Sequence, residues 1–176
     1  MLKEYNLTLN TKENIAKIIA YVGSDEERMD ELMKQFVGND TRVCQVTSWA
    51  VGHIGEQQPN LLAPYHNLLL SNFKDTAKPD AIRRNIARVY QFLAIPESIE
   101  SELFDLSLAN ILNHNEAIAI RAFSMTIAER IAKKHPELTS ELSVAVESTI
   151  ENGSSGLKNR ATHTIIRLTK TKNKTN

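Results

Sequence analysis

Two arginines with helical spacing are the first residues in this sequence that suggest ligand chemistry. Arg84 and Arg88 stand four residues apart, so they share one face if their segment is an α-helix. A guanidinium presents a planar fork of N–H donors that matches the oxygens of a carboxylate or a phosphate. Charged residues on a helix more often form a solvated face. If this face lines the inner side of the fold, however, it is suited to bind an acidic peptide or a phosphate.

A second pair, Trp49 and His53, has the same spacing and therefore also shares a helix face. Trp49 is the single tryptophan of the chain. A tryptophan at such a position more often packs in a core or an interface than it forms a platform for a ligand, and both interpretations stay open here. In either case Trp49 is the best single probe of the protein.

No set of residues has the spacing of a catalytic or metal site. Cys44 and His53 are nine residues apart, about two and a half helical turns, so they point to opposite sides and do not form a nucleophile–base pair. The five histidines are His53, His66, His114, His135 and His163. They form neither an HExxH motif nor a close cluster with cysteine. We therefore assign no catalytic residue, metal ligand or cofactor, and we expect Cys44 to be a small buried apolar residue.

The composition is that of an ordinary globular protein. Apolar residues make up 41% and charged residues 24% of the 176 residues, which is too apolar for a disordered chain. Lys plus Arg number 21, as do Asp plus Glu, so the charge gives no support to nucleic-acid binding. A single cysteine excludes an intrachain disulfide. No apolar stretch is long enough for a membrane span and no signal-peptide core precedes the first helix, so we expect a cytoplasmic protein.

Apolar residues recur at intervals of three and four almost throughout, which predicts an all-α fold with no strand. The expected helices are Lys12–Val22, Asp25–Val37, Thr41–Glu56, Leu61–Phe73, Asp80–Leu93, Glu97–Leu112, Glu116–Lys134, Glu137–Glu151 and Ser155–Leu168. Candidate N-caps are Ser24 or Asp25 for the second helix, Asp40 for the third and Asn60 for the fourth. Pro64 falls in the first turn of its predicted helix, where it should bend the helix and not break it. Short connections between these nine helices predict antiparallel neighbours.

The helices repeat with a fixed period. Pro59, Pro96 and Pro136 are 37 and 40 residues apart and each separates two helical patterns. When helices are superposed on this period, Val43, Ile82, Ile120 and Leu157 coincide. A period in this range predicts a solenoid of about four stacked helical pairs, in which each pair buries the apolar face of its neighbour. We expect one domain over residues 1–168, followed by a basic, disordered tail at 169–176.

One helix also resembles a known repeat family. The segment from Val43 to Gly55 is similar to the second helix of a HEAT-like repeat, in the variety first described in phycobilin lyases, with the pattern V-R-x-x-A-A-W-A-L-G-x-I-G. The matching residues are Val43, Trp49, Ala50, Gly52, Ile54 and Gly55, with Val51 conservative. Departures are Cys44 in place of Arg, and Thr47 and Ser48 in place of Ala. The resemblance covers about residues 25–168 and implies an α-α superhelix, that is, a HEAT-like solenoid.

The resemblance also implies a role for the position after the first apolar residue of each copy. That position holds Cys44, Arg83, Arg121 and Lys158. In the family such basic residues often pair with an Asp of the neighbouring repeat and with loop carbonyls, and this structural role is favoured over ligand contact. Because ligand contact stays open, the candidate binding surface comprises Trp49, His53, Arg84, Arg88 and Arg121.

The favoured function is a non-enzymatic scaffold that binds a protein or peptide partner on exposed positions of three predicted helices, Thr41–Glu56, Asp80–Leu93 and Glu116–Lys134. The main alternative is nucleic-acid binding or DNA-alkylation-repair glycosylase activity, which occurs in some proteins that resemble this one. Action on a bilin or another tetrapyrrole follows only from the name of the repeat type. The stretch Gly153–Asn159 looks like a fragment of the serine loop of the adenylosuccinate lyase superfamily, but a turn and a helix cap at Ser154 or Ser155 explain it better. We also expect self-association into a homodimer if an end repeat is poorly covered.

Overall fold

The computed structural model describes residues 2–175 of the chain, and the side chains of all of these except Lys3, Asn152 and 171–175. The described residues contain helices and no strand, as predicted. The α-helices are α1 Lys12–Val22, α2 Glu26–Phe36, α3 Thr41–Gln57, α4 Pro59–Leu62, α5 His66–Lys74, α6 Asp80–Val89, α7 Glu97–Leu112, α8 Ile118–Ala132, α9 Thr139–Asn152 and α10 Ser155–Thr175. Three 3-10 helices are η1 Leu2–Glu4, η2 Ala63–Tyr65 and η3 Pro136–Leu138. None of the described helices combines the length and apolar character that crossing a bilayer requires.

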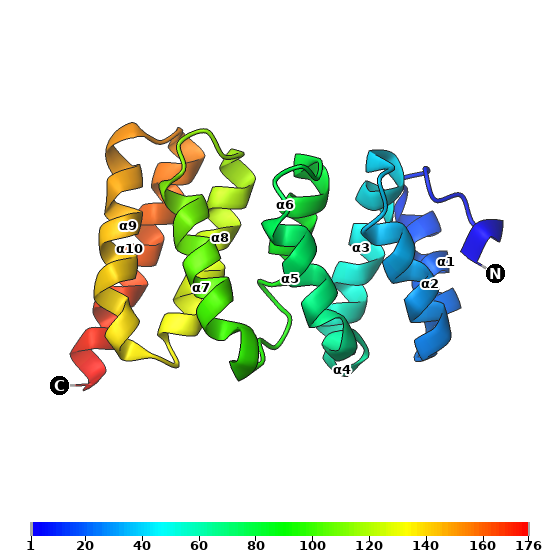
Figure 1. The fold of residues 1–176 in the computed structure, drawn as a ribbon, viewed down its shortest axis with the longest axis horizontal. Helices are drawn as coiled ribbons and strands as arrows, with labels where there is room; N and C mark the ends of the chain where they lie inside the picture. Colours follow the sequence, from blue (N-terminus) through cyan, green and yellow to red (C-terminus); the bar gives the residue numbers. More distant parts are fainter. Residues whose placement is uncertain (1, 176) are drawn as a thin grey trace. The chain divides into compact units, whose positions relative to one another are not determined.

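The chain divides into two compact units, Met1–Ala94 and Ile95–Asn176. In the first unit α3 is central, because it packs against α1, α2 and α6, while α5 packs on α6 (Figure 1). The core between these helices is built from fully buried side chains that include Phe36, Phe73 and Tyr90. The single domain over residues 1–168 stays a prediction.

Local signals set several helix ends of the first unit. The Asp25 side chain accepts a hydrogen bond from the Arg28 backbone N–H, and Asp40 accepts from the N–H groups of Arg42 and Val43. Both are therefore the N-caps that the sequence predicts. Gly23 ends α1 with φ +53°, a backbone conformation that L side chains rarely adopt.

The fourth predicted helix, Leu61–Phe73, is wrong in its start and its continuity. Helix α4 begins at Pro59, and Asn60 is not its cap. The chain then passes through the 3-10 turn η2, which contains Pro64, before α5 begins at His66. The physical reason is that Pro59 fits the first helical position, where no N–H partner is needed. Pro64 then lies too far along the helix to be tolerated without loss of the α-helical hydrogen bonds.

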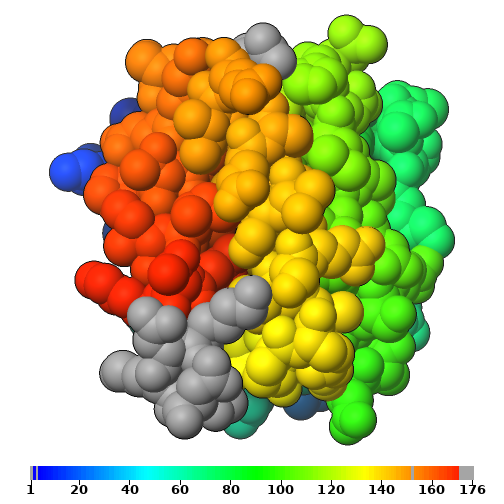
Figure 2. All heavy atoms as spheres, turned by 90° about the vertical axis from the view of Figure 1, so that its left-hand side faces the viewer, coloured from blue at the N-terminus to red at the C-terminus, as the bar shows by residue number. Residues whose placement is uncertain are grey.

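The second unit is a stack of two helical pairs. α7 packs on α8 and α9 on α10, and the pairs meet through α7 with α9 and α8 with α10, so α7 and α9 form one layer and α8 and α10 the other (Figure 1). Figure 2 looks onto the last pair, where α9 and α10 lie side by side at the surface. Val144 of α9 is 69% exposed and Ile166 of α10 is 44% exposed. The expected homodimer through an end repeat stays a prediction.

Apart from the fourth predicted helix, two helix ends differ from their predicted positions by more than two residues. α6 ends at Val89, whereas the apolar period predicted a helix to Leu93. Leu93 is nevertheless buried, from the turn that follows the helix. α10 extends beyond its predicted end at Leu168, as far as Thr175. The predicted tail at 169–176 falls largely outside the residues whose side chains are described, and its disorder stays a prediction.

A buried histidine of the first unit predicts a pH-dependent stability. His66 is 8% exposed, its Nδ1 has no hydrogen-bond partner, and its ring stacks on Tyr90 with 6.0 Å between centroids. Burial lowers the pKa of His66 below its ordinary value, so the unfolded chain takes up a proton before the folded chain does. We therefore expect the free energy of unfolding to fall as the pH drops below about 6.5.

The matched variant for this effect is His66→Phe, which keeps a ring against Tyr90 but cannot titrate. Urea unfolding followed by Trp49 fluorescence at pH 7 and at pH 5 should show a smaller loss of stability in the variant than in the unmodified protein. Equal losses in the two proteins would show that His66 is not the group responsible.

Candidate functional site

Trp49 on α3 and Arg88 on α6 meet across the contact between these two helices. The guanidinium carbon of Arg88 lies 3.8 Å from the centroid of the Trp49 ring, well within cation–π distance. Trp49 is 39% exposed, an unusual position for the single tryptophan of a chain. The structure therefore brings together one member of each pair that the sequence singles out.

Two of the three arginines of α6, Arg84 and Arg88, form no ion pair with an acidic side chain among the described residues. Arg84 and Arg88 are half-buried, and the guanidinium group of neither forms a hydrogen bond or an ion pair with a described residue. Other arginines of the same unit are satisfied. Arg28 pairs with Asp25 at 3.4 Å, and Arg42 donates to the carbonyl oxygen of Thr8. Each free guanidinium has five N–H donors, so the α6 pair offers an unused set of donors.

The electrostatics of the pair agree with this geometry. Burial lowers the pKa of Arg88, and the positive charge of Arg84 lowers it further. The carboxylate of Glu56 on α3 acts in the opposite direction, but it is not within ion-pair distance of Arg88. Glu56 instead lies 3.7 Å from Nδ1 of His53. We define the α3–α6 surface as Trp49, His53, Glu56, Arg84 and Arg88.

Glu56 is the member of this surface that sequence reasoning missed. It lies seven residues after Trp49, two helical turns along the same face, so the spacing alone could have found it. The pairing of Trp49 with Arg88 also had a sequence signal. Each lies six residues after a superposed apolar position, Val43 or Ile82, so the two residues occupy the same place in successive repeats.

Arg121 does not belong to any exposed surface, which corrects its place among the candidate binding residues. It is 5% exposed, and its Nε and one terminal nitrogen donate to the carbonyl oxygen of Ile111 at 3.1 and 2.9 Å. The reason is position: Arg121 follows a buried apolar residue, Ile120, and points to the end of the preceding helix α7.

The other members of this series reach equivalent atoms. Arg83 donates to the carbonyl oxygen of Phe73 at the end of α5, and Lys158 donates to that of Glu151 at the end of α9. The expected contact with carbonyl oxygens is therefore confirmed. Such contacts satisfy acceptors that a helix leaves without partners at its C-terminus, and they place a positive charge at the negative end of the helix dipole.

Cys44, the uncharged member of the series, is fully buried, as predicted. Burial raises the pKa of its thiol to about 11, so almost no thiolate is present near neutral pH. His53, by contrast, is exposed. The two residues therefore do not meet, as their spacing on α3 predicts.

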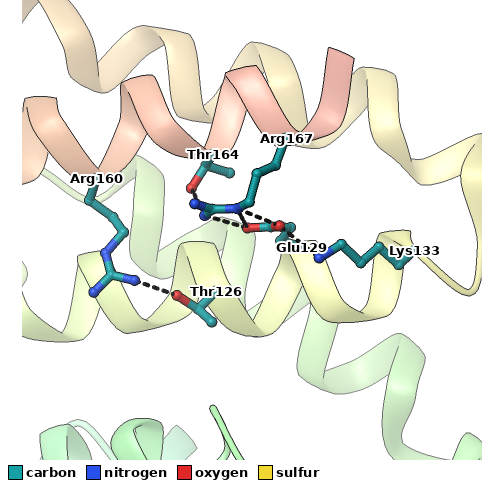
Figure 3. A network of polar contacts seen from close by, with 6 residues as sticks. All are labelled: Thr126, Glu129, Lys133, Arg160, Thr164 and Arg167. Carbon is teal, nitrogen blue, oxygen red and sulfur yellow. Dashed lines mark hydrogen bonds and ion pairs between the residues drawn. The ribbon is translucent and has the colours of Figure 1, made fainter. Parts of the chain in front are cut away.

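Two polar clusters of the second unit bind its helices together. Glu129 of α8 is 3% exposed and accepts a bidentate pair from Arg167 of α10, with Lys133 at 2.9 Å (Figure 3). Glu100 of α7, which is 4% exposed, accepts from Lys134 and lies 2.7 Å from Nε2 of His135. A cavity of about 220 Å³ adjoins Glu100. In the part of the chain that the structure describes, no three His, Cys, Asp or Glu side chains gather as metal ligands.

The stretch Gly153–Asn159 forms a turn and a helix start. The hydroxyl of Ser154 accepts from the backbone N–H of Leu157 at 3.4 Å, just before α10 begins at Ser155. Ser154 is therefore the cap that the sequence predicts, and the serine-loop resemblance needs no catalytic explanation.

Comparison with known proteins identifies one family. A family model described as HEAT repeat domain matches residues 5–168. No curated protein and no solved structure matches the chain significantly.

Proposed function

From the premise that this chain belongs to the HEAT repeat domain family, we propose that it is a non-enzymatic scaffold that binds a protein or peptide partner on the α3–α6 surface. The family membership agrees with the all-α, helical-repeat fold and with the HEAT-like resemblance of Val43–Gly55. Repeat folds of this kind expose long rows of helix positions to their partners. The fold by itself indicates no partner. The chemistry of the α3–α6 surface therefore has to indicate one.

The observation that supports this proposal is the exposed ring of Trp49 held under the guanidinium of Arg88. Trp and Arg are the residues most enriched at the energetic centres of protein interfaces. A tryptophan that already has a fixed neighbour loses little conformational entropy on binding. Free donors on Arg84 and Arg88 add polar specificity beside this apolar anchor.

Nucleic-acid binding has less support on the same surface. The chain has no net charge, and the negative charge of Glu56 acts on Arg88. Duplex binding draws most of its affinity from many phosphate contacts, and two guanidiniums supply few of them. The DNA-alkylation-repair glycosylases named above also use a groove with aromatic side chains and an acidic catalytic residue. Aromatic residues are scarce in this chain, and Trp49 is its single tryptophan.

The test is capture of a partner by the immobilised protein from an extract of its native cell, in parallel with Trp49→Ala. We expect the unmodified protein to retain a protein partner that Trp49→Ala does not retain. The purified partner should then shift the fluorescence emission of Trp49, because binding removes water from the ring.

Ile166→Ala is the control for this experiment, since it also truncates an exposed apolar side chain, on α10 of the second unit. It should capture the partner as well as the unmodified protein does. Retention of the partner by Trp49→Ala, or specific retention of nucleic acid in place of protein, would contradict the proposal.

A further inference from the structure

We propose that the α3–α6 surface binds an extended acidic peptide segment whose alternate residues are Asp or Glu, with one carboxylate on Arg84 and the next on Arg88. This inference rests on the proposed function and names the chemistry of its ligand. It depends on three features of the first unit: unused guanidinium donors, a fixed position for one of them, and the four-residue spacing of the two arginines on α6.

The unused donors point to an anion. Among the described residues the guanidinium groups of Arg84 and Arg88 form no ion pair or hydrogen bond, although both side chains are half-buried. A partly buried guanidinium without an acceptor loses hydration without compensation. A carboxylate accepts two parallel N–H bonds from one guanidinium and so restores both charge balance and hydrogen bonding.

The Trp49 ring fixes Arg88 before any ligand arrives. With its guanidinium carbon 3.8 Å from the ring centroid, Arg88 is restrained on one face, so less side-chain entropy is lost when a carboxylate binds. The exposed part of the ring then borders the peptide and offers an apolar contact beside the acidic residue.

The spacing of the arginines fits an extended chain. Residues four apart on a helix are separated by about 6 Å along its axis. In an extended peptide, side chains that point to the same side are two residues apart, or about 6.6 Å. An Asp or Glu at positions i and i+2 therefore aligns with Arg84 and Arg88 when the peptide runs along α6.

Glu56 opposes this ligand and provides a diagnostic variant. Its negative charge acts on Arg88 without forming an ion pair, so it competes weakly with an incoming carboxylate. Glu56→Gln removes that charge and should tighten the binding of an acidic peptide. A gain in affinity cannot arise from a damaged fold.

The experiment is fluorescence anisotropy with labelled Gly/Ala peptides that carry two glutamates at i and i+2, two glutamates at i and i+1, or two glutamines at i and i+2. We expect the tightest binding for the i and i+2 glutamates. We expect Arg84→Gln and Arg88→Gln each to weaken that binding about tenfold, and Glu56→Gln to strengthen it. The logarithm of affinity should fall with that of salt concentration with a slope of no more than about 2, since two cations are involved.

Arg28→Gln is the matched control. Arg28 lies in the same unit and stacks on Tyr21 at 5.0 Å, but Asp25 neutralises it, so its removal should leave binding unchanged. Equal loss in Arg28→Gln, equal binding of the glutamine peptide, or tighter and more salt-sensitive binding of duplex DNA would overturn the inference. If no acidic peptide binds while Trp49-dependent capture of a partner persists, this inference fails and the proposed function stands.

Discussion

Arg121→Ala should lower the free energy of unfolding by about 3 kcal/mol. The substitution removes a buried guanidinium that donates twice to the Ile111 carbonyl oxygen, and hydrogen bonds from charged donors contribute about 1.5–3 kcal/mol. It also leaves a cavity beside α7, which adds to the loss. Burial already lowers the pKa of Arg121, so part of the gain from these bonds is offset by the cost of desolvating the charge.

Urea unfolding followed by far-ultraviolet circular dichroism measures this loss. Arg121→Met is the matched control, because it restores most of the volume but no donor, and it should cost about 1–2 kcal/mol, the price of one unsatisfied carbonyl. If Met and Ala were equally harmful, the donors would account for the whole effect. If neither variant changed the midpoint, the carbonyl contact would have no structural role.

Arg167→Ala should destabilise the second unit by about 2–3 kcal/mol. It leaves the buried carboxylate of Glu129 without its bidentate partner (Figure 3), and loss of one member of a buried ion pair typically costs about 3–5 kcal/mol. We expect the smaller loss of about 2–3 kcal/mol for Arg167→Ala, because Lys133 remains 2.9 Å from Glu129 and the Arg167 side chain is itself 42% exposed.

The control is Arg160, which lies seven residues before Arg167 on the same face of α10. Arg160 donates to the neutral hydroxyl of Thr126 at 3.0 Å, so Arg160→Ala should cost only about 1 kcal/mol. Circular dichroism reports the whole chain, whereas Trp49 fluorescence reports the first unit. A loss seen by both probes at the same urea concentration would show that the effect is not confined to the second unit.

Lowering the pH should remove the contribution that the Glu129–Arg167 ion pair makes to the free energy of unfolding. Burial would raise the pKa of Glu129, but the hydrogen bonds from Arg167 and Lys133 outweigh burial and hold the pKa below its ordinary value. The stabilisation is therefore present above the unfolded pKa of about 4.5 and is lost as the pH falls through the folded value.

Local signals in the sequence were enough to predict much of the fold. The bounds Lys12–Val22 and Glu97–Leu112 agree with α1 and α7, because a capping residue or a proline at one end coincides with a break in the apolar period. The apolar period predicts the wrong helix end where an apolar residue beyond the helix is buried from the following turn. Leu93 remains in phase with α6, yet the helix ends at Val89, since burial alone does not require helical backbone.

The sequence predicts the two residue pairs of the α3–α6 surface but not the contact between them. Helical spacing places Trp49 with His53 and Arg84 with Arg88, but the contact between Trp49 and Arg88 depends on the packing of α3 against α6. The same limit explains Arg121. The repeat resemblance favours a structural role for this residue but leaves ligand contact open. The choice depends on its burial, which follows from the place of α7 beside α8 and is specified by no single helix pattern.

One contact of the first unit shows how such a chain tolerates the loss of a family residue. Where Cys44 replaces the usual arginine, the carbonyl oxygen of Val37 at the end of α2 accepts instead from the ammonium group of Lys78, which belongs to the segment before α6. A lysine more than thirty positions from Cys44 in the chain thus supplies a cation at the end of α2. Successive repeats can therefore differ in sequence while the contacts between their helices are kept. Comparison by sequence identity alone then underestimates how similar the repeats are.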